Sequence, residues 1–224
     1  MGFPRDCDIC VQAKINTHLF HGDIELNLKP VKGANPSVLL VGQDPTIAKG
    51  RIYSVLDLEN TSSSLYKYIV GEILQPAGLK IDNIYATDLI KCRFPNNQTP
   101  KIISQSHGVK MRDFLTPFFL NCRRWLIQEL RDIHPRIVLS FGEPVHQLLI
   151  QEFSWTVPIG MKDAFGNMYI VGLFHDNVYY IPCIHINSKR HPHYRNRWNG
   201  FIQSLKKTVI SARGLNTSFP FPYQ

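Results

Sequence analysis

Three side chains with acid–base chemistry each follow an apolar run that has the pattern of a buried parallel strand. They are Asp44, Asp88 and His185. Because ligands bind beyond the carboxyl ends of parallel strands, we expect the two acids and the imidazole to converge at one edge of a sheet. Each residue alone is as well explained by a turn or by a satisfied polar group. Three of them at one edge indicate a binding or catalytic site.

The cysteines form a second group of chemically capable residues. Cys7 and Cys10 have a Cys-x2-Cys spacing, and Cys92 and Cys122 follow far downstream. Four thiolates suit a [4Fe–4S] cluster or a structural zinc ion. A zinc ribbon would normally contain two Cys-x2-Cys knuckles, and this chain has one. Cys183 lies within an apolar run and is expected to be a small core residue.

The positive charge of the chain is concentrated at one end. The sequence has 25 Lys+Arg against 17 Asp+Glu, a net charge of +8, and no acidic residue follows Asp176. We call residues 185–224 the basic segment. Its cations are Lys189, Arg190, Arg195, Arg197, Lys206, Lys207 and Arg213. This asymmetry favours attraction to a phosphate backbone, although a solvated basic helix without a partner would have the same composition.

An α/β fold would position these residues. Strands are expected at residues 37–42, 83–87, 136–140 and 178–184, helices at 62–74, 122–133, 144–151 and 192–209, and an inserted hairpin at 155–177. The alternation predicts a single domain, residues 1–224, with a central four-stranded parallel sheet and helices on both faces. Residues 94–119 are expected to be an insertion, because they are rich in proline and polar residues, and residues 211–224 a tail.

Length and composition exclude several classes of protein. A chain of 224 residues with 44% hydrophobic and 19% charged residues can bury a core, which argues against a disordered chain. Five cysteines are too few for a disulfide scaffold. The apolar runs are too short to cross a bilayer, and the N-terminus has no apolar signal region. We therefore expect an intracellular protein without membrane contact.

Three segments, in this order, resemble motifs of the uracil-DNA glycosylase superfamily. Residues 41–45, Val-Gly-Gln-Asp-Pro, are similar to its water-activating motif. Residues 51–55, Arg-Ile-Tyr-Ser-Val, resemble the segment that carries the aromatic residue stacking on the flipped base. Residues 185–188, His-Ile-Asn-Ser, resemble the second motif, which is normally His-Pro-Ser. The similarity covers most of the chain, from residue 7 to about residue 209.

Two further segments resemble the iron–sulfur branch of that superfamily. Residues 84–93 are similar to its strand and cysteine segment, and residues 122–142 to its cysteine, helix and following strand. The resemblance implies that a [4Fe–4S] cluster is held by Cys7, Cys10, Cys92 and Cys122. Such a cluster would attach the N-terminus and the insertion to the sheet, since glycosidic hydrolysis needs no redox step.

The resemblance implies a DNA repair hydrolase that flips a deaminated base, uracil foremost, and hydrolyses its N-glycosidic bond. Asp44 would orient the attacking water and stabilise the cationic sugar. Tyr53 would stack on the base, and His185 with the backbone N–H of Gln43 would stabilise negative charge on it. The residues expected to bind the base are Gly42, Gln43, Tyr53, Asp88 and Asn187. Those expected to contact the DNA backbone are Ser54, Ser188, Lys189, Arg190 and Arg195, with a helix cap as the equal alternative for Ser188.

The base-reading position departs from the family pattern. The usual residue there is Asn, and this chain has Asp88. An ionised carboxylate only accepts hydrogen bonds and would face O4 of uracil with repulsion. Either Asp88 is protonated, or another base is read, or the site is not catalytic. The second motif also has Ile186 in place of Pro, and Lys189-Arg190-His191 replaces the usual apolar wedge.

Three functions therefore remain in competition. The favoured one is a base-excision glycosylase, a monomer in the cytoplasm with the nucleoid or in the nucleus, whose partner is DNA containing a damaged or deaminated base. The second is a glycosylase-like protein that binds DNA without catalysis, which would not need Asp44 or Tyr53. The third is a nucleoside hydrolase or nucleotide-binding enzyme, which would not need the basic segment.

Overall fold

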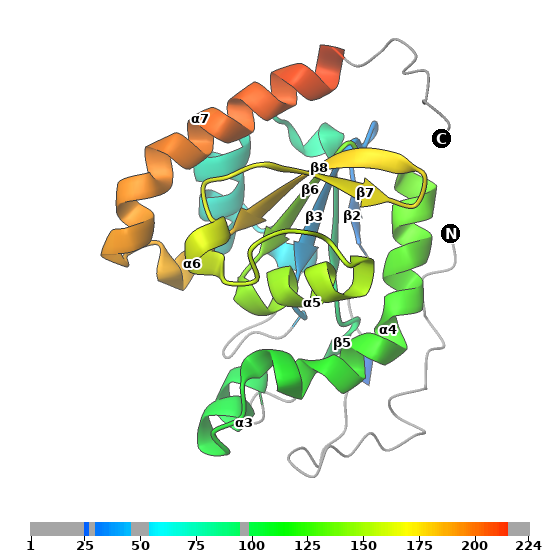
Figure 1. The fold of residues 1–224 in the computed structure, drawn as a ribbon, viewed down its shortest axis with the longest axis vertical. Helices are drawn as coiled ribbons and strands as arrows, with labels where there is room; N and C mark the ends of the chain where they lie inside the picture. The colour runs from blue at the N-terminus through cyan, green and yellow to red at the C-terminus, as the bar shows by residue number, and fades with distance from the viewer. Residues whose placement is uncertain (1–24, 27–29, 46–53, 95–98, 215–224) are drawn as a thin grey trace.

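The computed structural model describes residues 25–26, 30–45, 54–94 and 99–214. They form a six-stranded sheet with helices packed around it (Figure 1). The strand order is β2 (Val31–Lys32), β4 (Ile84–Asp88), β3 (Val38–Gly42), β6 (Ile137–Phe141), β8 (Asp176–Cys183) and β7 (Tyr169–Leu173). The four middle strands are parallel, and they are the four that the sequence predicts. The two outer strands run antiparallel to their neighbours.

The prediction of a purely parallel, four-stranded sheet is therefore wrong at both edges. β7 and β8 are joined by a tight turn at Phe174 and His175, and so short a connection can only join antiparallel strands. β2 has two residues, too few to give a periodic signal in the sequence. The hairpin expected within residues 155–177 is present as the β7–β8 pair, preceded by the short helix α6 (Met161–Ala164).

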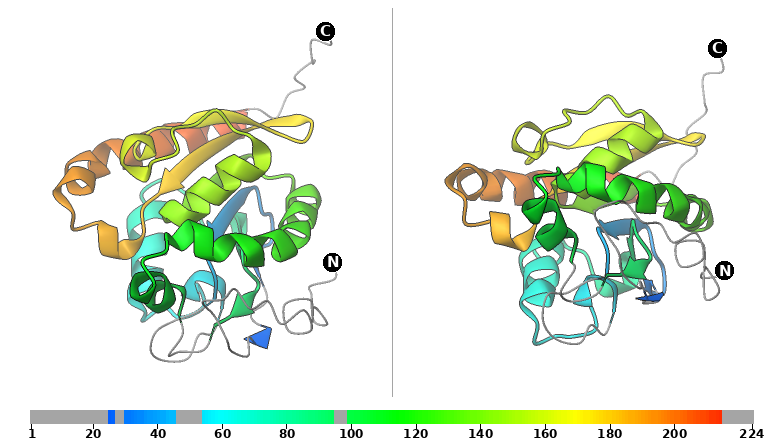
Figure 2. Two further views of the ribbon diagram at one scale, coloured as in Figure 1. Left: turned by 60° about the horizontal axis from the view of Figure 1, so that its bottom comes forward. Right: turned by 90° about the horizontal axis from the view of Figure 1, so that it is seen from below.

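Two apolar layers enclose the sheet, because its central strands are buried on both faces. In β3, Leu39 and Val41 face one layer, while Val38 and Leu40 face the other. The first layer contains α4 (Met111–Ile133) and α5 (Glu143–Phe153). The second contains η2 (Lys67–Leu74), a π-helix that continues α2 (Ser64–Tyr66), and α7 (Pro192–Gly214). Figure 2 shows these helices from two further sides.

The described part of the segment 94–119, which the sequence predicts to be an insertion, is largely helical. Its described residues form α3 (Pro100–Ser106) and the first turns of α4, which begins at Met111 rather than at Cys122. Phe94, Phe114 and Phe118 pack together there, with ring centroids 4.9–5.9 Å apart. Pro117 lies inside α4 and hides the helical pattern, since proline removes a backbone hydrogen bond from a helix interior.

The remaining described elements are short. They are β1 (Glu25–Leu26), η1 (Val55–Asp57), η3 (Ile81–Asn83), β5 (Cys92–Arg93) and η5 (Ile186–Ser188), and β1 pairs antiparallel with β5. The helices predicted at 62–74, 144–151 and 192–209 are confirmed with shifted ends. None of the helices in the described part of the chain is long and apolar enough to cross a membrane.

Candidate active site

A cavity of about 440 Å³ lies beyond the carboxyl ends of the parallel strands. Its wall contains residues that follow β3, β4, β6 and β8, as expected for a sheet of this kind. The cavity brings together most of the predicted site residues: Gly42, Gln43, Asp44, Ser54, Asp88, His185, Asn187 and Ser188. Tyr53, predicted to stack on the base, lies outside the described residues.

The ends of β3 and β4 are joined by backbone hydrogen bonds that place the two acids. The N–H of Leu89 donates to the carbonyl of Gly42 (2.9 Å), and that of Ile90 donates to the carbonyl of Gln43 (3.0 Å). The side-chain amide of Gln43 donates to Oδ2 of Asp44 at 2.8 Å. This bond orients one carboxylate oxygen of Asp44.

Gly42 is directly opposite Asp88 in the β3–β4 register. A Cβ atom on Gly42 would collide with Oδ1 of Asp88 and would lie 2.8 Å from the side chain of Leu56. Only glycine allows the strand end and the Asp88 carboxyl to come so close. Gly42 therefore makes room for the Asp88 carboxyl.

Asp88 is buried with 3% of its surface exposed. Burial raises its pKa to about 8, and the negative charges of Asp44 and Glu129 act in the same direction while Lys91 opposes them. Among the described residues, no group donates to or accepts from its Oδ2. A carboxyl group in this environment keeps its proton at neutral pH and can donate a hydrogen bond.

His185 immediately precedes η5 and presents its ring to the cavity. The backbone N–H of Asn187 donates to its Nδ1 at 3.2 Å, so the neutral ring carries its proton on Nε2. The ring keeps access to water through the cavity, but partial burial and the charge of Lys101 lower the pKa of His185. The imidazole is thereby maintained as a neutral donor.

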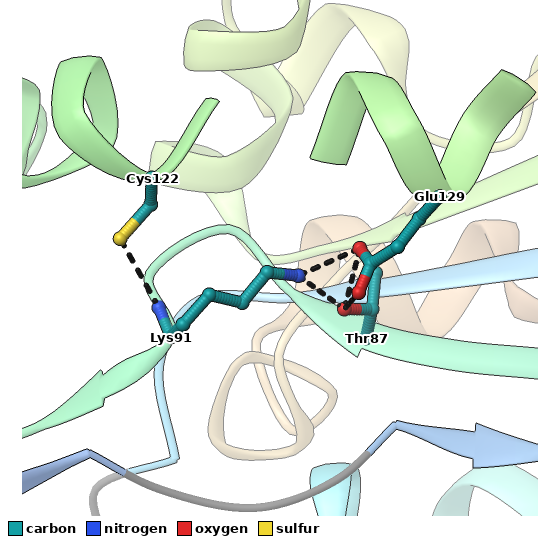
Figure 3. Close-up of polar contacts among 4 residues, drawn as sticks. All are labelled: Thr87, Lys91, Cys122 and Glu129. Carbon is teal, nitrogen blue, oxygen red and sulfur yellow. Dashed lines mark hydrogen bonds and ion pairs between the residues drawn. The ribbon is translucent and has the colours of Figure 1, made fainter. Parts of the chain in front are cut away.

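Behind Asp88 lies a buried polar network (Figure 3). The ammonium of Lys91, 3% exposed, lies 2.7 Å from Oε2 of Glu129 on α4 and also donates to the hydroxyl of Thr87. The Thr87 hydroxyl lies 2.9 Å from the same carboxylate oxygen. Burial and the Glu129 carboxylate raise the pKa of Tyr85, on the same strand. The network fixes α4 against the strand that carries Asp88.

The same network reaches the predicted metal ligands. The backbone N–H of Lys91 donates to Sγ of Cys122 at 3.4 Å (Figure 3). Cys92 follows directly in the sequence and begins β5. Both thiols are buried. Among the described residues, no three His, Cys, Asp or Glu side chains gather as a metal site, but Cys7 and Cys10 lie outside that part of the chain. Two buried thiols, one of which accepts from a backbone N–H, suit two of the four ligands of a four-cysteine cluster site.

The predicted DNA-backbone residues are distributed over several environments. Lys189 forms an ion pair with Glu72 and lies 4.9 Å from the ring centroid of Trp198. Arg190 and Arg195 are exposed. Ser54 is buried, and its hydroxyl accepts from the N–H of Glu59 at 2.9 Å. That bond helps to hold the turn after Ser54 in place. The other predicted DNA-backbone residues are partly or fully exposed: Ser188, Lys189, Arg190 and Arg195.

Sequence reasoning missed several residues of the cavity wall. These are Leu56, Asp57, Lys101, Met111 and Glu143. Glu143 is an acidic residue that follows the end of β6, just as Asp44, Asp88 and His185 lie at or after the ends of predicted strands. Its position in the sequence could therefore have indicated it. Lys101 and Met111 come from the segment treated as an insertion, and no sequence pattern placed it beside the strand ends.

Fold and cavity together define an α/β protein with paired acids and a neutral imidazole at the carboxyl ends of its central strands. The family model of the Uracil DNA glycosylase superfamily matches residues 30–211, and the chain belongs to this superfamily. It is also similar to the type-4 uracil-DNA glycosylase of Archaeoglobus fulgidus, 26% identical over 87 residues. That match covers 38% of this chain and 36% of the relative. Membership of the superfamily supports a DNA glycosylase.

Proposed function

We propose that the protein is a DNA glycosylase that removes a deaminated base, uracil foremost, by hydrolysis of its N-glycosidic bond. The observation that carries this proposal is the placement of Asp44, Asp88 and His185 in one cavity. These groups match the three needs of the reaction: activation of water, reading of the base edge and stabilisation of the leaving base.

In the proposed reaction, the target nucleotide leaves the base stack and enters the cavity. Tyr53 stacks on the base. Asp44, oriented by the amide of Gln43, holds the water and faces the positive charge that develops on the sugar. The Nε2–H of His185 and the backbone N–H of Gln43 donate to the base oxygen that becomes negative, while Gly42 and Asn187 complete the wall.

Reading of uracil depends on the protonated form of Asp88. Its carbonyl oxygen accepts from N3–H of the base, and its hydroxyl donates to O4. The pKa of about 8 supports this form at neutral pH. The same carboxyl supports a second candidate, a glycosylase for another damaged base, because a carboxyl that loses its proton would instead accept from an exocyclic amine.

The four predicted ligand cysteines would hold a [4Fe–4S] cluster, and the two described thiols fit that assignment. When bound, the cluster supplies a structural cross-link between the N-terminal segment, β5 and α4. Exposed cations of the basic segment, with Ser188 at the cavity, would contact the phosphate backbone of the DNA partner. We also propose that the protein acts as a monomer and is located with the DNA of the cell.

Single-turnover assays test this function. Oligonucleotides that carry uracil, hypoxanthine, xanthine or a thymine mismatch are incubated with the protein, and abasic sites are measured. We expect release of uracil, abolished by Asp44→Asn with DNA binding nearly unchanged. Release of a different base would favour the second candidate. No release of any base, with binding intact, would favour a DNA-binding protein without catalysis.

A further inference from the structure

One wall of the cavity comes from outside the sheet. Lys101 of α3 and Met111 at the start of α4 line it together with the strand-end residues. The position of α3 is well fixed: Pro100 and Ile103 are buried, and the Thr99 side chain accepts from the N–H of Ile102. The backbone of Lys101 is therefore held at the cavity although its side chain is exposed to solvent.

Among the described residues that line this cavity, Lys101 is the one lysine or arginine. The other ionisable side chains of the wall include Asp44, Asp57 and Glu143, together with Asp88, which holds its proton at neutral pH. In the part of the chain that the structure describes, no carboxylate lies within 4.0 Å of the Lys101 ammonium. Within the described residues, Lys101 is thus a cation without a carboxylate partner at a site whose proposed substrate becomes negative.

Lys101 also acts on His185. Its positive charge contributes to the lowered pKa of the His185 ring, after the effect of burial. The ionised carboxylates of the described cavity wall, Asp44, Asp57 and Glu143, would have the opposite effect on that pKa, whereas Asp88 is protonated at neutral pH. Lys101 and His185 line the same cavity, and the effect of the ammonium on the pKa of His185 supports this placement.

We propose that Lys101 is a catalytic residue whose ammonium binds the base oxygen that becomes negative, beside the Nε2–H of His185. This assignment rests on the proposed function and adds to it a charged group from outside the strand ends. In the reaction, the C1′–N bond breaks and its electron pair stays on the base. The water oxygen bonds to C1′, the water proton passes to Asp44, and the anionic base takes a proton from solvent after release.

A positive charge at that oxygen matters most when the base is a poor leaving group. A base that carries an electron-withdrawing substituent stabilises its own anion and needs the cation less. A phosphate contact would behave differently, because it would contribute equally whichever base is attached. The dependence of the rate on the leaving group therefore distinguishes a lysine that binds the base oxygen from a lysine that binds a phosphate oxygen.

The first experiment needs no activity. The His185 pKa is measured by NMR titration of the ring in the wild-type protein, in Lys101→Met and in Lys101→Arg. Lys110→Met is the control, because Lys110 is exposed and does not line the cavity. We expect the pKa of His185 to rise in Lys101→Met only. An unchanged pKa in that variant would show that the ammonium is not near the ring and would overturn the proposal.

The second experiment measures single-turnover excision of uracil and of 5-fluorouracil, a better leaving group. Lys101→Met should slow uracil release about tenfold or more, in line with loss of one charge-stabilising donor, and 5-fluorouracil release clearly less. Lys101→Arg should recover most of the rate. Equal losses for both bases with a flatter salt dependence of DNA binding would assign Lys101 to a phosphate and contradict the proposal. If the wild-type protein released neither base, the proposed function would fail, whatever the NMR result.

Discussion

The backbone N–H of Asn187 donates to Nδ1 of His185 at 3.2 Å. This hydrogen bond occupies the ring nitrogen on the η5 side and leaves Nε2 to carry the proton of the neutral imidazole. Asn187, predicted as a base-binding residue, therefore has a defined effect through its main chain. It sets which atom of His185 can donate into the cavity.

His185→Ala should reduce the rate of base release about a hundredfold without abolishing it, as deletion of one charge-stabilising donor does. Burial and the charge of Lys101 lower the pKa of His185 from its usual value of 6.5. We therefore expect any acid limb that this group imposes on the wild-type rate to be centred below pH 6.5. A pH–rate profile of single-turnover excision checks both points, and an acid limb centred above 6.5 would contradict the second.

Asp88 should impose an alkaline limb on uracil release. In the proposed reaction the protonated carboxyl donates to O4, and it ionises as the pH rises through about 8, so the rate should fall there. Asp88→Asn has no proton to lose and should remove this limb while it keeps or improves uracil release. If Asp88→Ala changes neither the rate nor the choice of base, Asp88 does not read the substrate.

The raised pKa of Asp88 also predicts a pH dependence of stability. The folded protein holds this proton up to about pH 8, whereas the unfolded chain loses it near pH 3.8. Stability contributed by Asp88 therefore falls as the pH rises between these values. Asp88→Asn should unfold at a higher temperature than the wild-type protein at pH 8, with the difference disappearing toward pH 4.

The buried ion pair between Lys91 and Glu129 should be costly to break. Glu129→Gln leaves the ammonium of Lys91 without its charge partner, and loss of one member of a buried pair typically costs about 3–5 kcal/mol. Urea unfolding measures this change. Asp113→Ala is the control, because its pair with Arg112 is half-exposed and should contribute about 0–1 kcal/mol. Lys91→Met combined with Glu129→Leu should cost much less than the single change.

The parts of the fold that the sequence predicts are those with strong local signals. The four central strands are continuous apolar runs, and their carboxyl ends placed Asp44, Asp88 and His185 in one cavity. The edge strand β2 was not predictable, because it has two residues and shows no periodicity, whereas β7 was expected as part of a hairpin. Lys101 was not predictable either, since its place at the cavity depends on how α3 packs against the rest of the chain.

The four predicted cluster ligands can be tested by metal analysis. The purified protein should be brown and contain iron and sulfide in about equal amounts. Cys92→Ser and Cys122→Ser should lose that colour, as should the corresponding changes at Cys7 and Cys10, whereas Cys183→Ser removes a thiol of the other core layer and should keep it. A colourless protein that contains one zinc ion would contradict the assignment.

The contribution of the basic segment to DNA binding can be resolved residue by residue. Arg190 and Arg195 are exposed, so Arg190→Ala and Arg195→Ala should each weaken binding to all sequences and flatten the salt dependence by about one unit for each lost phosphate contact. Lys189→Ala should have a smaller effect, because the carboxylate of Glu72 already neutralises that ammonium. Glu72→Gln releases Lys189 and should strengthen binding at low salt.

Binding measured by fluorescence anisotropy over a range of salt concentrations checks this order. If neither arginine variant changes the salt slope, the basic segment is only a solvated surface, and DNA must approach the cavity across another part of the molecule.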